Sequence, residues 1–380
     1  MTKQTKMDEN RNIINLGRGQ PQPKLLPREL MQRAAQATLE HKDYSLLNYG
    51  PGAGDKAYLE ALASYLSRGY GTAVQPDSLF TTNGASAALE LICSVFTKPG
   101  DTIFVEEPSY FLALKIFADH ELKIVGIPLT KDGIDLDTLD KLSRKHKPKL
   151  FYTIPVFQNP TGQIMSSETR EALLGLAHTH NFLVIADEVY QILDYTRSPP
   201  RPFASRLDTN RVLSVGSFSK ILAPGLRVGW IQTSQKLRQR LVSRGVVASG
   251  GCLNQFTPCL LTEALNHGWA ETYLTNLKSI YKARVAYMDS LLSEIATDHI
   301  SYQKPHGGFF FWLKLSQQIN TENALTRARQ HGLSYQPGSK FGSNPSLNSS
   351  LRLSFTYYEE TELQRGIESF ANFLQSEEVF

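Results

Sequence analysis

The sequence predicts an α/β protein in which a mainly parallel sheet lies between helices and a smaller α+β domain follows. Three observations lead to this fold class. Strand and helix patterns alternate from residue 85 to residue 233, a long helical pattern covers residues 270–295, and shorter segments follow from residue 300. Because a chain of 380 residues exceeds one ordinary hydrophobic core, we expect more than one domain.

Five apolar runs define the expected strands of the large sheet. They cover residues 102–105, 150–154, 182–186, 212–215 and 228–233. Apolar residues at helical spacing predict one helix at 85–96 and another after Ser166. Strands that alternate with helices form a sheet covered on both faces, and ligands bind beyond the carboxyl ends of such strands. We therefore expect a ligand site where these runs end.

The two ends of the chain predict the remaining organisation. The smaller domain rests on short strand and helix patterns, in segments 308–315, 321–331, 351–355 and 360–374. The prolines at positions 21, 23 and 27 predict an extended arm. We expect an arm with part of the small domain at 1–45, a large domain at 46–275 and a small domain at 276–380.

Charge and composition argue against several classes of protein. The net charge of +4 is small and no block of like charge occurs, so neither a nucleic acid nor a membrane surface is the expected partner. Residues 1–12 lack the apolar core of a signal peptide, and no apolar run is long enough to span a bilayer. The three cysteines have no C-x-x-C spacing, so we expect reduced thiols and no metal site. These features favour a cytoplasmic protein, and leave targeting to an organelle open.

The run from Ser217 to Trp230 is the most informative segment. Lys220 lies beside Ser219 and three residues after Ser217, and Arg227 follows seven residues later. Hydroxyls and a guanidinium hold a phosphate dianion through charge-assisted hydrogen bonds. A lysine amine beside a phosphate site favours pyridoxal phosphate (PLP), held as a Schiff base. A surface lysine in a turn is the alternative.

Other candidate residues follow predicted strand ends. Asp187 closes an apolar run, where a buried carboxylate needs a cationic partner such as a protonated pyridine nitrogen. Tyr190 and Asn159 could donate hydrogen bonds to the phenolate oxygen of the cofactor. An aspartate that caps a helix and an asparagine in a turn are the alternatives for Asp187 and Asn159.

Three further features complete the set of candidates. The helix expected to begin near Ser86 favours an anion at its N-terminus, although many helices begin this way. Tyr110, after a strand end, could stack on a flat heterocycle or pack in the core. Arg352 is flanked by apolar residues and fits a carboxylate ligand, or a glutamate in a structural ion pair.

These residues occur in an order that resembles the fold type I PLP-dependent aminotransferases of class I/II. The chain is most similar to the branch of 2-aminoadipate aminotransferases and the aminotransferase-like domains of MocR-type regulators, from about residue 15 to residue 373. The resemblance is carried by seven motifs in order, namely Asn48-Tyr49-Gly50-Pro51, Thr82-Asn83-Gly84-Ala85-Ser86, Glu107-Pro108-Ser109-Tyr110, Gln158-Asn159-Pro160-Thr161-Gly162, Asp187-Glu188-Val189-Tyr190, the Lys220 run and Leu351-Arg352-Leu353-Ser354.

The resemblance implies a mixed seven-stranded large sheet, a PLP cofactor and a role for each candidate. Lys220 is the implied Schiff-base lysine and proton shuttle, and Asp187 pairs with the pyridine nitrogen. The implied ligands of the phosphate are Ala85, Ser86, Ser217, Ser219, Arg227 and, from a neighbouring subunit, Tyr49. Asn159 and Tyr190 bind the phenolate oxygen, Tyr110 stacks on the ring, and Arg352, with Asn159 beside it, binds the substrate carboxylate. A homodimer with shared active sites follows.

The expected activity is transfer of an amino group between an L-amino acid and a 2-oxo acid. Arg18 lies in a segment that often closes over the substrate in this branch, so it could bind a distal carboxylate, or it could face solvent. The substrate side chain could be 2-aminoadipate-like, aromatic or large and apolar. β-Elimination on the same scaffold is the alternative reaction, because both need the same carbanion, and a non-catalytic PLP-binding regulator is the remaining alternative.

Overall fold

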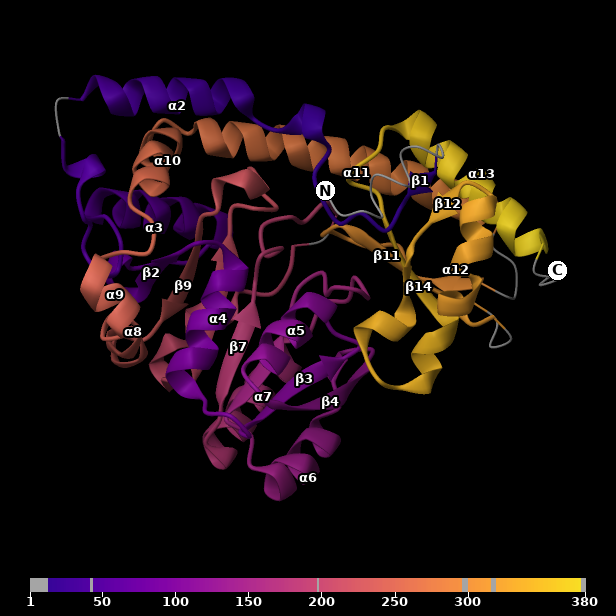
Figure 1. Cartoon of the computed structure of the whole chain (residues 1–380), viewed down its shortest axis with the longest axis horizontal. Coiled ribbons are helices and arrows are strands. Elements are labelled where there is room, and N and C mark those ends of the chain that lie inside the picture. The colour runs from indigo at the N-terminus through magenta and orange to yellow at the C-terminus, as the bar shows by residue number, and fades with distance from the viewer. Residues whose placement is uncertain (1–12, 42–43, 197, 296–299, 316–318, 377–380) are drawn as a thin grey trace.

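The computed structural model describes residues 13–41, 44–196, 198–295, 300–315 and 319–376. Within these residues, eight strands form one large sheet (Figure 1). In spatial order they are β2 (Leu79–Thr82), β9 (Gly229–Thr233), β8 (Val212–Ser217), β7 (Leu183–Asp187), β6 (Leu150–Thr153), β3 (Thr102–Glu107), β4 (Lys123–Thr130) and β5 (Gly133–Ile134). The five runs expected from the sequence are all strands here, with ends that differ by at most two residues.

Strand direction makes this sheet mixed but mainly parallel. β4, β3, β6, β7 and β8 run parallel to one another, whereas β9 is antiparallel to both β8 and β2. The resemblance implies a mixed sheet of seven strands, and the described sheet is mixed with eight. The eighth, β5, is only two residues long and turns back antiparallel on β4.

The two faces of the sheet bury two separate apolar clusters. Ile103, Val105 and Ile185 point into one cluster, and their neighbours Phe104 and Val184 point into the other. This alternation follows from the two-residue period of a strand. The helices α4 (Ala85–Phe96) and α5 (Phe111–Asp119) pack into the first cluster, and α6 (Leu136–His146) and α7 (Ser167–His180) pack into the second. Parallel strands covered in this way are buried on both faces, as the apolar runs predicted.

Short polar signals begin and end the helices around the sheet. Asp55, Asp135 and Ser166 each accept a hydrogen bond from a backbone N–H in the first turn of α3 (Lys56–Tyr70), α6 and α7. α7 ends at Asn181, which adopts the left-handed conformation that stops a helix. The helices α8 (Gln235–Val242), α9 (Gly245–Gly250) and α10 (Phe256–Asn266) follow the sheet.

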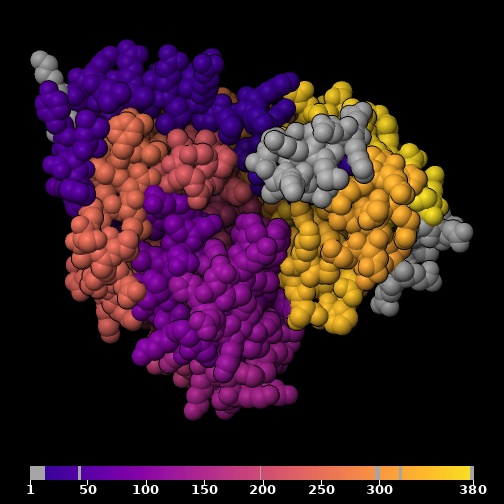
Figure 2. Space-filling view, viewed as in Figure 1, coloured from indigo at the N-terminus to yellow at the C-terminus, as the bar shows by residue number. Residues whose placement is uncertain are grey.

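A second sheet lies beside the first, on the right in Figure 1. Its order is β10 (Ile300–Tyr302), β11 (Phe310–Leu315), β14 (Ser350–Ser354) and β13 (Gln336–Pro337). It is accompanied by α12 (Thr321–Gln330) and α13 (Glu360–Ser376), and β1 (Ile14–Asn15) pairs in parallel with β12 (Leu333–Ser334). Figure 2 shows the C-terminal residues packed along one side of the remaining body. The domain limits at residues 45 and 275 remain a prediction.

The N-terminal segment differs from the extended arm expected from its prolines. A 3-10 turn, η1 (Pro23–Leu25), leads into the 13-residue helix α2 (Arg28–Glu40), which packs against α10. Pro27 stands before the first helical residue, where its missing N–H costs no intrahelical hydrogen bond. The prolines therefore mark the start of a helix as well as an extended stretch.

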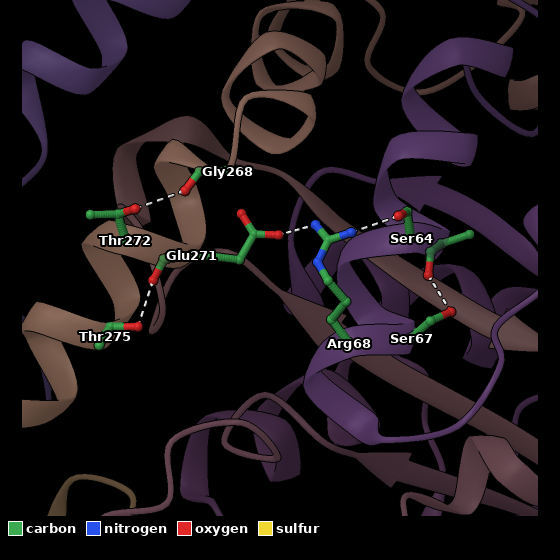
Figure 3. A network of polar contacts seen from close by, with 8 residues as sticks. Ser64, Ser67, Arg68, Gly268, Glu271, Thr272 and Thr275 are labelled. Atoms are coloured by element: carbon green, nitrogen blue, oxygen red, sulfur yellow. Dashed lines mark hydrogen bonds and ion pairs between the residues drawn. The ribbon is translucent and has the colours of Figure 1, made fainter.

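The long helix α11 (Trp269–Ile295) is tied to α3 by polar side chains (Figure 3). Arg68 on α3 forms an ion pair with Glu271 in the first turn of α11. Arg68 Nη1 also donates to Ser64 Oγ at 2.7 Å, which fixes the guanidinium along its own helix. Since α11 continues toward the second sheet, this pair anchors it to the helices around the first (Figure 1). No helix of the described residues is both long enough and apolar enough to cross a membrane.

Candidate active site

Lys220 lies where several strand ends meet. Its ammonium nitrogen donates to the Gly19 carbonyl oxygen at 3.1 Å and stands 5.2 Å from the centre of the Phe309 ring. Burial, together with the nearby charge of Arg352, lowers the pKa of Lys220 to about 8, while Asp187 opposes that shift. A lysine of this kind presents an appreciable fraction of neutral, nucleophilic amine near neutral pH.

Asp187 is the buried carboxylate at the end of β7. Its Oδ2 accepts a hydrogen bond from the Tyr152 hydroxyl at 2.8 Å. Among the described residues its other oxygen, Oδ1, is buried and has no hydrogen-bond partner. Burial raises the pKa of Asp187 to about 6, against the hydrogen bond from Tyr152, the N–H of Val189 and the charge of Lys220. The carboxylate thus has one oxygen held and one oxygen available for a cationic ligand.

Arg352 is 3% exposed and lies on β14 of the second sheet. Its Nη1 donates to Asn159 Oδ1 at 2.8 Å and its Nη2 donates to the Gly17 carbonyl oxygen at 3.0 Å. The guanidinium carbon stands 3.9 Å from the centre of the Phe310 ring. Its Nε is buried without a partner in the described chain, and burial lowers the pKa of Arg352 to about 10. A buried guanidinium whose charge meets no carboxylate is suited to an anionic ligand.

Two tyrosines complete this group. Tyr190 is buried, with its ring 6.3 Å from Phe310 in an edge-on arrangement. Tyr110 is half-buried and precedes α5. Burial raises the pKa of both hydroxyls, the charge of Arg352 opposes this rise, and the charge of Asp187 adds to it.

A second group of predicted residues surrounds the N-terminus of α4. Arg227, at the left-handed φ of 51°, donates from Nη2 to the Asn83 carbonyl oxygen at 3.1 Å. Ser217 Oγ lies 2.9 Å from Ser219 Oγ. Gly84 caps α4 with a φ of 86° and no side-chain hydrogen bond, so the N–H groups of the first turn, which contains Ala85 and Ser86, stay available.

Two features of the site can be compared with the two charged ends of PLP. The unpartnered Oδ1 of Asp187 suits a protonated pyridine nitrogen. At the other end, a Cβ on Gly84 would lie 3.0 Å from Arg227 Nη2, so the backbone and the guanidinium approach each other as a phosphate cradle requires. The donors and acceptors present therefore fit the two charged ends of PLP.

Two predicted residues stand apart from this group. Tyr49 is 84% exposed, just after the 3-10 turn η2 (Tyr44–Leu47). Arg18 is half-buried, with its guanidinium carbon 4.8 Å from the centre of the Tyr357 ring. The backbone on either side of Arg18 reaches the site, because Gly17 and Gly19 accept from Arg352 and Lys220.

Sequence reasoning missed several residues that support the site. Tyr152 holds Asp187 from the neighbouring strand, and Phe310 lies against Arg352. Glu106 and Gln158 bind the loops that carry Tyr110 and Asn159. Gln158 is the first residue of the Gln158–Gly162 motif, so the sequence did contain a signal that could have identified it. The other three look like ordinary core or strand-end residues until the strand order is known.

The comparisons with known proteins agree with this geometry. Residues 11–370 match the family of class I and II aminotransferases. The chain is 33% identical over 378 residues to the aromatic-amino-acid aminotransferase 1 of Thermococcus litoralis, covering 98% of this chain and 90% of that one. It is 29% identical to the 2-aminoadipate transaminase of Thermus thermophilus, covering 95% and 90%.

A solved structure shares the fold. The kynurenine aminotransferase of Pyrococcus horikoshii, solved as a complex with PMP, superposes with a TM-score of 0.91. It is 32% identical to this chain, with 98% of this chain and 93% of that one covered. The match to the family spans most of the chain, and solved relatives hold PMP or a phosphopyridoxyl amino acid. The chain therefore belongs to the class I and II aminotransferases and is a PLP-dependent transaminase.

Proposed function

We propose that this transaminase moves the amino group between an L-amino acid with a large side chain and a 2-oxo acid, with Lys220 as its proton-transfer group. The observation that carries this proposal is the buried convergence of the Lys220 amine, the Asp187 carboxylate and the Arg352 guanidinium. A base, a partner for a pyridine nitrogen and a carboxylate-binding group are the three functional groups that the reaction needs.

Each residue has a defined task in this proposal. Lys220 Nζ would take the proton from the substrate α-carbon and hold it for the return transfer. PLP, when bound, supplies a ring that withdraws the electrons left by that proton. Asp187 Oδ1 would hold the protonated pyridine nitrogen. Asn159 Nδ2 and the Tyr190 hydroxyl would bind the phenolate oxygen, and Tyr110 would lie against the ring.

The phosphate is assigned to the residues around the N-terminus of α4. The first turn of α4 offers free N–H groups and the positive end of the helix dipole. The Arg227 side chain adds a full positive charge beside Gly84. The proposed set is Ala85, Ser86, Ser217, Ser219, Arg227 and, from a second copy of the chain, Tyr49.

The substrate is proposed to enter between Arg352 and the Gly17-Arg18-Gly19 segment. Arg352 binds the α-carboxylate, because its guanidinium is buried and meets no carboxylate in the described part of the chain. Arg18, stacked on Tyr357, is proposed to meet the far end of the side chain. An arginine on an aromatic ring suits an aromatic or a dicarboxylic side chain, and relatives that act on aromatic amino acids and on 2-aminoadipate point the same way.

A homodimer with shared sites is also part of the proposal. Leu47 and Tyr49, together with Val246 and Phe256, present exposed apolar side chains near α9 and α10. η2 packs against α10, so these residues contribute to one region of the surface. An exposed apolar region of this kind favours association with a second copy.

A screen of single half-reactions tests the proposed function. Purified PLP-loaded protein is mixed with one amino acid at a time, and the loss of the visible absorbance of lysine-bound PLP is followed. We expect aromatic amino acids or 2-aminoadipate to react fastest and Lys220→Ala to remove the response, whereas Lys236→Ala, on the exposed face of α8, retains it. Release of ammonia without a 2-oxo acid acceptor would contradict transamination and favour elimination.

A further inference from the structure

Glu106 is a buried carboxyl group for which the proposed reaction has no use. It lies at the end of β3, is 1% exposed, and has no basic side chain within ion-pair distance among the described residues. Three donors reach it instead. The Thr153 hydroxyl donates to Oε1, and the Ile154 N–H and Gln158 Nε2 each donate to Oε2 at 3.1 Å. A carboxyl group this well supplied with hydrogen bonds is a fixed point in the core.

Gln158 uses every polar atom of its side chain. Its Nε2 donates to Glu106 and, at 2.8 Å, to the Pro108 carbonyl oxygen. Its Oε1 accepts from the N–H and from the hydroxyl of Thr161, both at 2.8 Å. Only 2% of this residue is exposed. One amide therefore joins the loop after β3 to the loop after β6.

These two loops carry residues with direct tasks in the proposed reaction. Asn159 follows Gln158 in the chain, and its Oδ1 holds Arg352 Nη1 at 2.8 Å. Tyr110 lies two residues after Pro108, whose carbonyl oxygen Gln158 binds. A shift of the Gln158 amide would thus move the Asn159 side chain and the Tyr110 ring relative to each other.

We propose that Gln158, anchored on Glu106, is a positioning residue that sets the Asn159 amide and the Tyr110 ring against the cofactor and Arg352. The inference rests on the proposed function for the tasks of Asn159 and Tyr110. We call the hydrogen bonds of Gln158 with Glu106, Pro108 and Thr161 the joint. The joint itself rests only on hydrogen bonds within the chain.

The joint tolerates either charge state of Glu106. Burial raises the pKa of Glu106 to about 7, with a further contribution from Asp187 on β7. Glu107 and Lys340 line the cavity of about 300 Å³ beside Glu106. When Glu106 is protonated, Oε2 still accepts from Gln158 and Ile154, and the new O–H can point to the Thr153 hydroxyl oxygen.

The decisive variant is Gln158→Glu. It removes the two N–H donors and sets a second carboxyl group against Glu106 and the Pro108 carbonyl oxygen, where two ionised carboxylates repel each other. At pH 8 we expect the amino-acid half-reaction to slow by roughly tenfold to a hundredfold, the loss that follows a small misplacement of reacting groups. The absorbance–pH titration of bound PLP should shift as well. Toward pH 5, a proton shared by the two carboxyl groups should bring the half-reaction rate of the variant much closer to that of the parent at the same pH.

Three controls separate positioning from a general loss of structure. Gln163→Glu makes the same change in the same loop, at a residue that contacts Gln158 through its backbone only, with no side-chain hydrogen bond to Gln158 or Glu106 among the described residues, and should leave the titration of bound PLP unchanged. Glu106→Gln keeps an acceptor for Gln158 and should stay within about threefold of the parent rate. The swap Glu106→Gln/Gln158→Glu puts a donor back between the two positions and should recover part of the activity at pH 8.

Amide hydrogen exchange and one further variant allow the proposal to be tested even if Gln158→Glu does not fold or the substrate is unknown. Exchange in residues 158–163 of the apoprotein should rise in Gln158→Glu, whether or not the parent proves to be active on a given substrate. If Gln158→Glu does not fold, Gln158→Met removes the same hydrogen bonds without a charge, and should show the same spectral shift with no recovery at low pH. A folded Gln158 variant with the parent's titration, rate and exchange would overturn the proposal, as would an equal effect of Gln163→Glu.

Discussion

At the scale of single residues, the site depends on how Tyr152 holds Asp187. Without a partner, a buried carboxylate turns freely and its charge is costly. The Tyr152 hydroxyl fixes Oδ2 at 2.8 Å, while Oδ1 is buried without a hydrogen-bond partner among the described residues. A hydrogen bond to a charged group contributes about 1.5–3 kcal/mol, so this single contact both orients and stabilises the ionised form.

Tyr152→Phe should weaken PLP binding roughly tenfold, because it removes one such hydrogen bond. It should also raise the pKa of Asp187, which burial already holds at about 6, so the acid limb of kcat/KM should move to higher pH. In the apoprotein, Asp187 makes stability depend on pH in the direction opposite to that of a carboxylate in an ion pair. Stability due to Asp187 is present at low pH and is lost as the pH rises through about 6, a window that the variant extends upward.

PLP titration and pH–rate profiles measure these effects. Tyr58→Phe is the matched control, because the Tyr58 hydroxyl is buried in α3 and has no hydrogen-bond partner among the described residues. An unchanged acid limb in Tyr152→Phe would show that the hydroxyl does not tune Asp187.

At the scale of elements, the end of β3 is joined to a turn that precedes β14. Glu107 Oε1 accepts from the N–H of Ser343 at 2.7 Å and from the N–H of Asn344 at 3.0 Å. The Phe341 carbonyl oxygen accepts from the Ser109 N–H at 2.7 Å, and the Phe341 ring lies 5.2 Å from the Arg352 guanidinium carbon. Glu107 therefore holds one wall of the Arg352 site from the other sheet.

Glu107→Ala should raise KM for amino acids roughly tenfold and change kcat by less than about threefold, since it loosens the Arg352 site and leaves the reacting groups in place. Steady-state kinetics with the best substrate from the half-reaction screen would measure the split. Glu107→Gln keeps an acceptor oxygen and should give a smaller rise. A fall in kcat at constant KM would instead place Glu107 in the chemical step.

At the scale of the whole molecule, the exposed apolar region near η2 is the feature that a single chain does not explain. Leu47 and Tyr49 are among the most exposed large apolar side chains of the described residues. Such side chains lose contact with water when a second copy covers them, at about 25 cal/mol per Å² of apolar surface. The proposed dimer thus accounts for both this surface and the position of Tyr49.

Leu47→Asp should convert a dimer into monomers, because it places a charge in the proposed interface. The same change should weaken PLP binding, since Tyr49 of one copy would no longer reach the phosphate bound by the other. Sedimentation velocity and PLP titration would measure both effects. Ile124→Asp, at an exposed apolar position on β4, is the control. If the parent protein sediments as a monomer and still binds PLP tightly, this prediction is wrong.

Much of the fold could be predicted because its signals are local. Buried parallel strands are recognisable as apolar runs, and the helix at residues 85–96 was predicted with the bounds that it has. The helix α2 was not predicted, because its prolines are also typical of an extended segment. Strand order, and with it the neighbours of each strand, has no comparable local signal.

By itself, the sequence determined which reactive groups the protein has and in what order they occur. Ser217, Ser219 and Arg227 share one strand and turn with Lys220, so their proximity follows from short-range geometry. Only the tertiary structure decided which distant residues support them. Arg352 meets Asn159 across 193 positions, and Tyr152 meets Asp187 because β6 and β7 are neighbours. Such contacts arise when sheets and loops pack together, and their energy depends on burial that no single segment can supply.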